Sequence, residues 1–260
     1  MRPRWLLLAG LFLAAPGSLQ AGPVGWGSDA ARPVAEGRVE VGLFSESRWG
    51  AMRNLELSTH PLWFFILPQV QAKVQWWQRD RVFFSSGHRA AYPSVFLSLV
   101  AKEGALGLLP PDAEVPVALI LDNHAILTWG WFQGHDATIQ LGAAVAPRTS
   151  SSLPVLDFPF LYQRFAPLFS SVAPRGGLVF GGDLGSSLGY SLGGEVFWFS
   201  LPSEKTGGLD AAWAFEEALR LDYYPGQSWR VSASLRASHA QLPIGWRTHL
   251  LPQIDLRVAW

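Results

Sequence analysis

The chain contains no cysteine among its 260 residues. A protein without cysteine has no disulfide framework, no thiolate metal site and no cysteine nucleophile. Charge is also scarce, because Asp, Glu, Lys and Arg make up 15% of the residues, against roughly 25% in soluble domains. The 20 basic and 20 acidic side chains balance, so the basic surplus typical of nucleic-acid-binding proteins is missing. We therefore expect no nucleic-acid partner.

An apolar run long enough for a membrane-spanning helix is missing as well. Residues 5–15 are apolar, but about 11 residues are too few to cross a hydrocarbon layer of roughly 30 Å as a helix. Arg2 and Arg4 precede this run and a segment ending at Ala21 follows it, which is typical of a secretory signal peptide. We expect residues 1–21 to be that signal and residues 22–260 to form one domain; an uncleaved anchor is the alternative. Any crossing after residue 21 must then be made by strands.

Alternating apolar and polar residues dominate the C-terminal part of the chain. Apolar side chains stand at every second position through most of residues 209–223, 229–237 and 254–260. A period of two predicts strands, and these are as long as the 9–11 tilted residues that cross a bilayer. Glu217 breaks the pattern, because strict alternation would place its charge among the apolar side chains. We expect a β-bulge near Glu216 and Glu217, or a position near the membrane interface.

Similar but less regular segments occur upstream. With the three C-terminal strands they predict a closed antiparallel transmembrane β-barrel of about 12 strands, ten being the alternative; an even number is usual for bacterial single-chain barrels. The nine upstream strands are expected near residues 39–43, 55–57, 70–76, 82–89, 115–121, 125–132, 137–145, 178–185 and 190–201. Asp122 and Asn123 are expected to form the turn of a hairpin between two of them.

Three apolar segments bounded or broken by prolines do not alternate. They are residues 61–68, residues 94–109, which have a helical pattern, and residues 153–169. If the carboxy terminus is periplasmic, counting strands places the first two on the periplasmic side and the third in an outer loop. These segments could lie among lipid headgroups, fold into the barrel mouth or bind an envelope partner.

The last residues carry a more specific pattern. Apolar residues alternate up to a terminal aromatic residue at Ile254, Leu256, Val258 and Trp260. This ending resembles the terminal β-signal of bacterial outer-membrane proteins, although Val258 stands where that signal often has an aromatic residue. The resemblance implies recognition by the barrel-assembly machinery of a Gram-negative cell. It also implies a location in the bacterial outer membrane, in contact with its lipid.

Charged side chains occupy the polar faces of the C-terminal strands. We expect six of them to face the lumen: Arg220, Asp222, Arg230, Arg236, Asp255 and Arg257. A ring of arginines could favour anionic solutes in an open pore. The favoured interpretation is that arginines and aspartates pair across the lumen and help to close it, because unpaired charge is costly between low-dielectric walls.

Histidines offer the only visible catalytic chemistry. Ser86 and His88 share one face of a predicted strand, as a nucleophile and its base require, whereas Ser238 and the adjacent His239 point to opposite faces. Polar wall or loop histidines are the favoured interpretation of both pairs. The pairs His135–Asp136 and Asp122–His124 could bind a metal ion, but spacing does not bring three ligands together. We expect no metal and no other cofactor.

These observations lead us to expect a small-solute pore or channel, or a structural envelope barrel, rather than an enzyme. An interfacial lipid hydrolase that uses Ser86 and His88 is one alternative. A secreted soluble β-sandwich is another, although its strands should be shorter than the ones predicted here.

Overall fold

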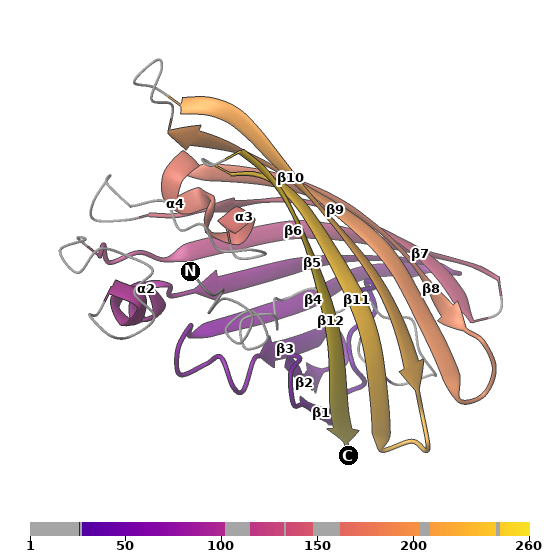
Figure 1. The fold of residues 1–260 in the computed structure, drawn as a ribbon. Helices are drawn as coiled ribbons and strands as arrows, with labels where there is room; N and C mark the ends of the chain where they lie inside the picture. The colour runs from indigo at the N-terminus through magenta and orange to yellow at the C-terminus, as the bar shows by residue number, and fades with distance from the viewer. Residues whose placement is uncertain are drawn as a thin grey trace.

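The computed structural model describes residues 26, 28–101, 115–132, 134–147, 162–202, 209–242 and 245–260, so the predicted signal peptide at 1–21 lies outside the described residues. Twelve strands form a closed antiparallel barrel in which consecutive strands pair and β1 pairs with β12 (Figure 1). The prediction of a closed barrel with 12 strands is confirmed. Closure also excludes the two-sheet sandwich.

The strands differ in length around the barrel. Strands β4 to β12 contain 10 to 15 residues each, and β1 to β3 contain four to six. The strands are β1 (Val39–Gly42), β2 (Ser47–Met52), β3 (Leu55–Thr59), β4 (Gln69–Arg79), β5 (Val82–Ala91), β6 (Ile120–Phe132), β7 (His135–Val145), β8 (Val172–Asp183), β9 (Leu188–Pro202), β10 (Leu209–Tyr223), β11 (Trp229–Leu242) and β12 (Gly245–Ala259). The helices are α2 (Ser94–Ala101), α3 (Tyr162–Phe165) and α4 (Pro167–Ser170). None of the described helices is long and apolar enough to span a membrane.

Two errors in the predicted strands cancel in the count. Strand β2 was not predicted, and the expected hairpin around Asp122 and Asn123 is wrong, because both residues lie inside the continuous strand β6. Asp122 pairs in register with Arg89 on one side and Ala144 on the other. Contacts with neighbouring strands therefore override the turn preference that Asp and Asn have in isolation.

The helices all lie at one end of the barrel. The short connections β2–β3, β4–β5, β6–β7, β8–β9 and β10–β11 share an end with the carboxy terminus, which we call the turn end. The segments that carry α2, α3 and α4 lie at the opposite end, the helix end (Figure 1). The prediction that the segments at 61–68 and 94–109 lie opposite to the one at 153–169 is wrong. Because β2 was missed, the strand count was one too low from β3 to β5, and the false hairpin in β6 corrected it afterwards. The segments at 61–68 and 94–109 were therefore assigned to the wrong end.

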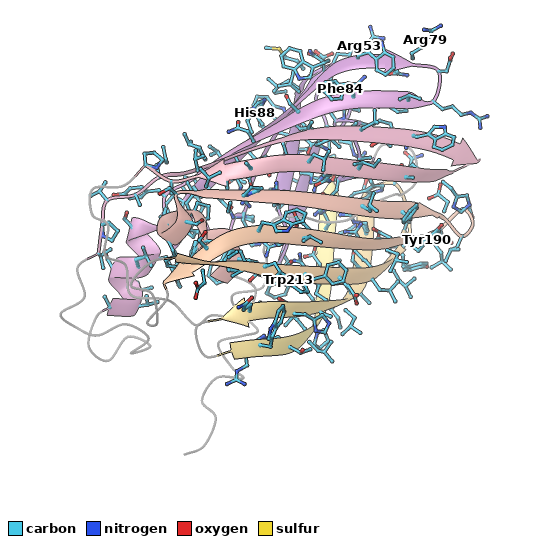
Figure 2. The ribbon with its side chains drawn as sticks, turned by 90° about the horizontal axis from the view of Figure 1, so that it is seen from above. Arg53, Arg79, Phe84, His88, Tyr190 and Trp213 are labelled. Atoms are coloured by element: carbon cyan, nitrogen blue, oxygen red, sulfur yellow. The ribbon has the colours of Figure 1, made fainter. Side chains whose placement is uncertain are left out.

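The outer wall of the barrel is apolar and bears tryptophans near both ends. Residues with large exposed aromatic rings near the turn end are Trp49, Trp129, Tyr223, Trp229 and Trp260, and those near the helix end are Trp198, Trp213 and Trp246 (Trp213 is labelled in Figure 2). Along β10, the ten residue steps from Trp213 to Tyr223 rise about 25 Å when a strand tilts by about 40°. That height and the aromatic belts are those of a transmembrane barrel. Even-numbered single-chain barrels of this kind are proteins of the bacterial outer membrane, and the chain is one of them.

Glu217 occupies the outer wall without any local irregularity. It pairs in register with Gly194 on β9 and Ala237 on β11, and the ladders on both sides are continuous. The predicted bulge at Glu216 and Glu217 is therefore wrong. Glu217 is exposed and Glu216 is buried, so the two carboxylates face opposite sides of the wall.

The helix end of the lumen is filled by an apolar core. Phe96 and Leu97 of α2, Phe165 of α3 and Leu168 of α4 are buried against inward side chains of the strands. The rings of Phe96 and Phe165 lie 5.7 Å apart. Small inward residues on the wall make room for the helices; they are Ala144, Ala173, Ala212, Ala214 and Ala240. The helical segments thus fold into the barrel mouth, one of the three places considered for them.

Candidate functional site

The charges expected to face the lumen alternate with exposed apolar side chains. Arg257 and Arg230 are 0% and 1% exposed. Arg257 lies 3.3 Å from Glu40, Arg220 lies 3.1 Å from Asp222, and Arg236 lies 3.4 Å from Glu216. Asp255 accepts a hydrogen bond of 2.7 Å from the backbone N–H of Phe44. These pairs join side chains of the same strand or of neighbouring parts of the wall, and not opposite sides of the lumen as the closed-lumen interpretation had them.

The segment before β1 occupies the lumen toward the turn end. Lys73 donates to the backbone carbonyl of Ser28 at 2.7 Å, and Arg48 pairs with Asp29 at 3.1 Å. Across the barrel, the backbone N–H of Ala31 donates to the Thr128 hydroxyl at 2.7 Å. The guanidinium of Arg230 lies 5.1 Å from the ring centre of Trp26. Because strands β2, β4, β6 and β11 all contact it, this segment acts as a plug; we call residues 26 and 28–34 the N-terminal plug.

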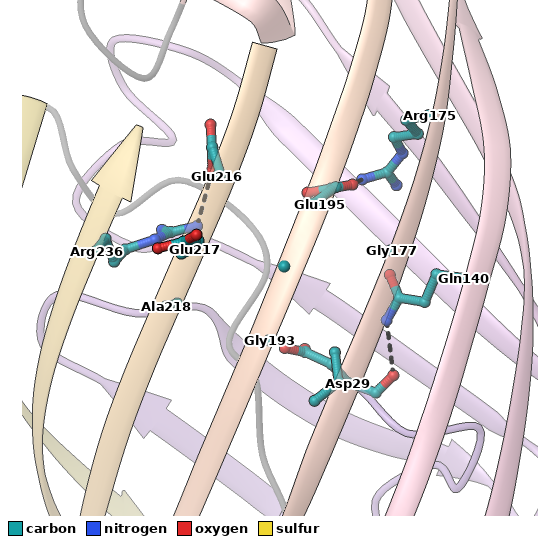
Figure 3. A pocket seen from close by; sticks show the side chains of 12 residues that line it. Asp29, Gln140, Arg175, Gly177, Gly193, Glu195, Glu216, Glu217, Ala218 and Arg236 are labelled. Carbon is teal, nitrogen blue, oxygen red and sulfur yellow. Dashed lines mark hydrogen bonds and ion pairs between the residues drawn. The ribbon is translucent and has the colours of Figure 1, made fainter. Parts of the chain in front are cut away.

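A small polar cavity lies beside the plug, between Asp29 and the inner faces of β7 to β11. Its volume is about 50 Å³, enough for one or a few waters. Arg175 and Glu195 pair at 2.6 Å beside it, and Gln140 donates to the Asp29 carbonyl at 3.0 Å (Figure 3). The described residues therefore place ion pairs and apolar side chains in the lumen.

A hydrogen-bonded serine, histidine and asparagine lie on the opposite, outer face of the wall. The Ser86 hydroxyl is 2.8 Å from His88 Nε2, and His88 Nδ1 is 2.7 Å from Asn123 Oδ1. Both contacts are exposed to the outside of the barrel. Figure 2 shows His88 and Phe84 on this side of β5.

Strand geometry explains why these side chains meet. On β5, Ser85 and Gly87 are buried toward the lumen, so Ser86 and His88 point outward together. On β6, Asp122 and His124 are buried, and Asn123 between them is exposed. Register brings His88 directly opposite Asn123. The predicted shared face of Ser86 and His88 is thus confirmed, and β6 supplies a third member.

The two residues that end this chain of hydrogen bonds, Trp76 and Asn123, fix the direction of every hydrogen bond in it. The indole N–H of Trp76, which can only donate, reaches the Ser86 hydroxyl at 2.7 Å. The amide oxygen of Asn123 can only accept, so His88 carries its proton on Nδ1 and leaves Nε2 as an acceptor. Ser86 then donates its hydroxyl proton to Nε2. This is the protonation state that a nucleophile and general base need.

The surroundings of the group are apolar. In register beside it stand the small residues Ala72, next to His88, and Ala125, next to Ser86. Larger exposed side chains lie further out, among them Phe84, Leu127 and Leu141, which are 37%, 41% and 62% exposed. In an outer membrane these side chains face lipid, so the serine hydroxyl is presented to lipid molecules rather than to bulk water.

The other histidine pairs do not form such a group. His124 points inward, where Asp122 and Arg175 contact it. His135 points outward to Tyr190 at 3.1 Å, while the adjacent Asp136 points inward to Arg32 at 2.7 Å. The two pairs considered for a metal ion therefore lie on different strands. Asp122 and His124 both face the lumen from β6, whereas His135 and Asp136 of β7 face opposite sides of the wall.

Sequence reasoning missed two members of the outer group, Asn123 and Trp76. Asn123 was assigned to a turn, and assigning β6 as one strand would have placed it beside β5. The exposed pair Trp76–Trp77 gave no signal of its own, because its effect depends on a register shift in β4. A serine two residues before a histidine was the signal that the sequence did carry.

No family model matches this chain, and no curated protein matches it. Among solved structures, it is similar to OmpT, an outer-membrane protein of Vibrio cholerae, with 8% identity and a TM-score of 0.43 over 85% of this chain and 64% of that one. It is also similar to OccAB2 of Acinetobacter baumannii, with 12% identity and a TM-score of 0.41 over 83% and 53%, and to a bacterial polysaccharide outer-membrane secretin, with 9% identity and a TM-score of 0.46 over 86% and 69%. The chain thus spans less than two thirds of the length of OmpT and OccAB2. These likenesses identify neither a family nor an activity.

Proposed function

We propose that this barrel is a lipid hydrolase that cleaves acyl esters at its outer wall. The observation that carries the proposal is the continuous chain of hydrogen bonds from Ser86 through His88 to Asn123, on the side of the barrel that faces lipid. A serine and a histidine that face lipid also satisfy each other's hydrogen-bonding groups, as the hydroxyl of Thr248 and His239 do elsewhere on the wall. What distinguishes the Ser86 group is its third member, Asn123, which orients the ring of His88. A serine that attacks a carbonyl needs both the histidine and the group that orients it.

The residues would act as nucleophile, base and orienting group. Ser86 Oγ attacks the ester carbonyl carbon while its proton passes to His88 Nε2. Asn123 holds the imidazole in the required tautomer through Nδ1. Collapse of the tetrahedral intermediate releases the alcohol portion of the lipid, which takes the proton from His88. Water, activated by the same histidine, then releases the fatty acid from Ser86.

The substrate class follows from where the serine lies. The wall around Ser86 is uncharged and apolar, which suits acyl chains lying against the barrel. The neighbouring indole of Trp76 is 64% exposed, and indoles prefer the membrane interface, where the ester carbonyls of lipids are found. Bilayer phospholipids and the acylated lipids of the outer leaflet both present such esters.

The test is release of fatty acid from lipid vesicles by the purified, refolded protein. Phospholipid vesicles and vesicles containing lipid A are assayed separately, so that the two sources of ester are distinguished. Ser86→Ala and His88→Ala should each lower kcat by at least about 10³-fold. Asn123→Ala should lower it less, because it frees the ring to rotate without removing the base.

The chain offers a matched control on the same outer surface. His239 and Thr248 form another exposed histidine–hydroxyl pair at 2.9 Å, on β11 and β12, and His239→Ala should leave hydrolysis unchanged. A fluorophosphonate should label Ser86 in the wild type and not in Ser86→Ala. Wild-type protein that neither hydrolyses any vesicle nor reacts with the fluorophosphonate would contradict the proposal, as would full activity in Ser86→Ala.

A further inference from the structure

Strand β4 contains an irregularity beside the serine. Gln75 pairs with Ser85 and Trp77 pairs with Phe84, so Trp76 is an extra residue without a partner in the register. Such a β-bulge redirects side chains and is common next to active sites. Here it leaves both Trp76 and Trp77 exposed on the outer wall, at 64% and 46%, and brings the Trp76 indole N–H to within 2.7 Å of Ser86 Oγ.

A serine hydrolase also needs a donor for the oxyanion that develops on the carbonyl oxygen. Many hydrolases use free backbone N–H groups, but β5 is an interior strand. Its ten residues from Val82 to Ala91 pair in register with β6 on one side and with β4 on the other. Ladder pairing occupies the backbone N–H groups around Ser86. A side-chain donor is therefore required at this wall.

We propose that the indole N–H of Trp76 is the oxyanion donor of the Ser86 site, an inference that rests on the proposed lipid hydrolase. When Ser86 Oγ bonds to the carbonyl carbon, the carbonyl π electrons move to its oxygen, and the proton of Ser86 moves to His88. The new oxyanion lies within about 2.5 Å of Oγ, so an N–H that already reaches Oγ needs only a small rotation to reach it. Trp76 remains a donor throughout and exchanges no proton.

Trp76→Phe tests this role, because it keeps the aromatic bulk and the bulge backbone while it removes one N–H. In vesicle assays we expect kcat to fall about 10²- to 10³-fold with KM within about twofold of the wild-type value. The rate of Ser86 labelling by a fluorophosphonate, whose phosphoryl oxygen occupies the oxyanion position, should fall in parallel. Trp77→Phe is the matched control, since it changes the adjacent exposed indole of the same bulge, and both rates should stay unchanged.

Four outcomes separate the two proposals. If Ser86→Ala abolishes activity and Trp76→Phe alone slows both reactions, the donor role is supported. If Ser86→Ala abolishes activity and Trp76→Phe has wild-type rates, only the donor role is overturned. A Trp76→Phe variant with faster rates would overturn it too, since the indole would then obstruct the serine. Failure of Ser86→Ala to lower activity overturns the hydrolase itself. Heat-modifiable migration on gels verifies that each variant is folded before it is compared.

Discussion

At the scale of single residues, the face of the wall on which a side chain lies decides its chemistry. Asp122, Asn123 and His124 are consecutive, yet Asp122 forms an ion pair and His124 a hydrogen bond in the lumen, and Asn123 orients His88 outside. A strand of period two sends neighbours to opposite environments. The same triplet placed in a turn would have formed neither contact.

His60 provides a pH-dependent contribution to stability at the helix end. Its ring is fully buried, at 0% exposure, and Nδ1 accepts a hydrogen bond from the Trp63 N–H at 3.2 Å. Burial lowers the pKa of His60 from 6.5 to about 4, outweighing smaller opposing effects from the Phe44 backbone and from Asp255. The folded protein therefore binds fewer protons than the unfolded chain between these two pH values.

It follows that the free energy of unfolding should decrease as the pH falls through this window. The contribution of His60 is fully present above about pH 6.5, is lost progressively toward pH 4, and amounts to about 3 kcal/mol. Thermal unfolding in detergent between pH 7.5 and 4 measures it. His60→Gln should flatten this part of the profile, whereas His239→Gln, on the outer face of the wall, should leave it unchanged. An identical profile in His60→Gln would refute the assignment.

At the scale of elements, α3 is attached to the wall through one carboxylate. Glu216 on β10 accepts hydrogen bonds from Gln163 and from both terminal nitrogens of Arg164, the second at 2.9 Å. Arg236 on β11 approaches the same carboxylate at 3.4 Å. A short helix of four residues has little intrinsic stability, so this contact and its apolar packing must hold α3 in the barrel mouth.

Glu216→Gln should therefore destabilise the barrel by about 3 kcal/mol, because it leaves two buried guanidinium groups with less compensating charge. The adjacent Glu217→Gln is the natural control: Glu217 lies on the outer wall, and removing its charge should be neutral or stabilising. The temperature at which the folded gel band disappears measures both. Equal effects of the two substitutions would show that the inward contact does not hold α3.

At the scale of the whole molecule, the lumen and the outer wall have separate roles. The N-terminal plug, the paired charges and the helices lie in the described part of the interior. The reactive group lies outside, among apolar side chains. Filling stabilises the wall as a rigid platform, and rigid elements hold catalytic geometry better than loops do.

A barrel filled in this way should not conduct ions. We expect no conductance steps when the refolded protein is reconstituted in planar bilayers, under conditions in which a general porin gives clear steps. The physical reason is that Lys73, Arg48 and the plug close the lumen toward the turn end while apolar side chains close it at the helix end. Reproducible steps from folded protein would contradict this prediction and support the pore hypothesis.

Much of the architecture could be predicted from alternation alone. Strand β10 was placed closely, and so was the outward face of Trp213, because every second side chain in a long spanning strand must tolerate lipid. Strand β11 ends five residues later than predicted and β12 begins nine residues earlier, where the alternation is less regular. Strand β2, with Gly50 and Met52 around a register shift, has no such regular pattern and was missed. Asp122 and Asn123 were wrongly predicted to form a turn because turn preference is a local property, whereas the residues that pair with them on β5 and β7 are distant in sequence.

The sequence by itself determined that this chain crosses a membrane with strands, and that Ser86 and His88 share a face. Both follow from periodicity, which is a property of neighbouring residues. Only the tertiary structure decided that Asn123 and Trp76 join them, that the plug enters the lumen and that all the helices share one end. Each of these depends on strand register and barrel closure, which bring together residues that no local pattern connects.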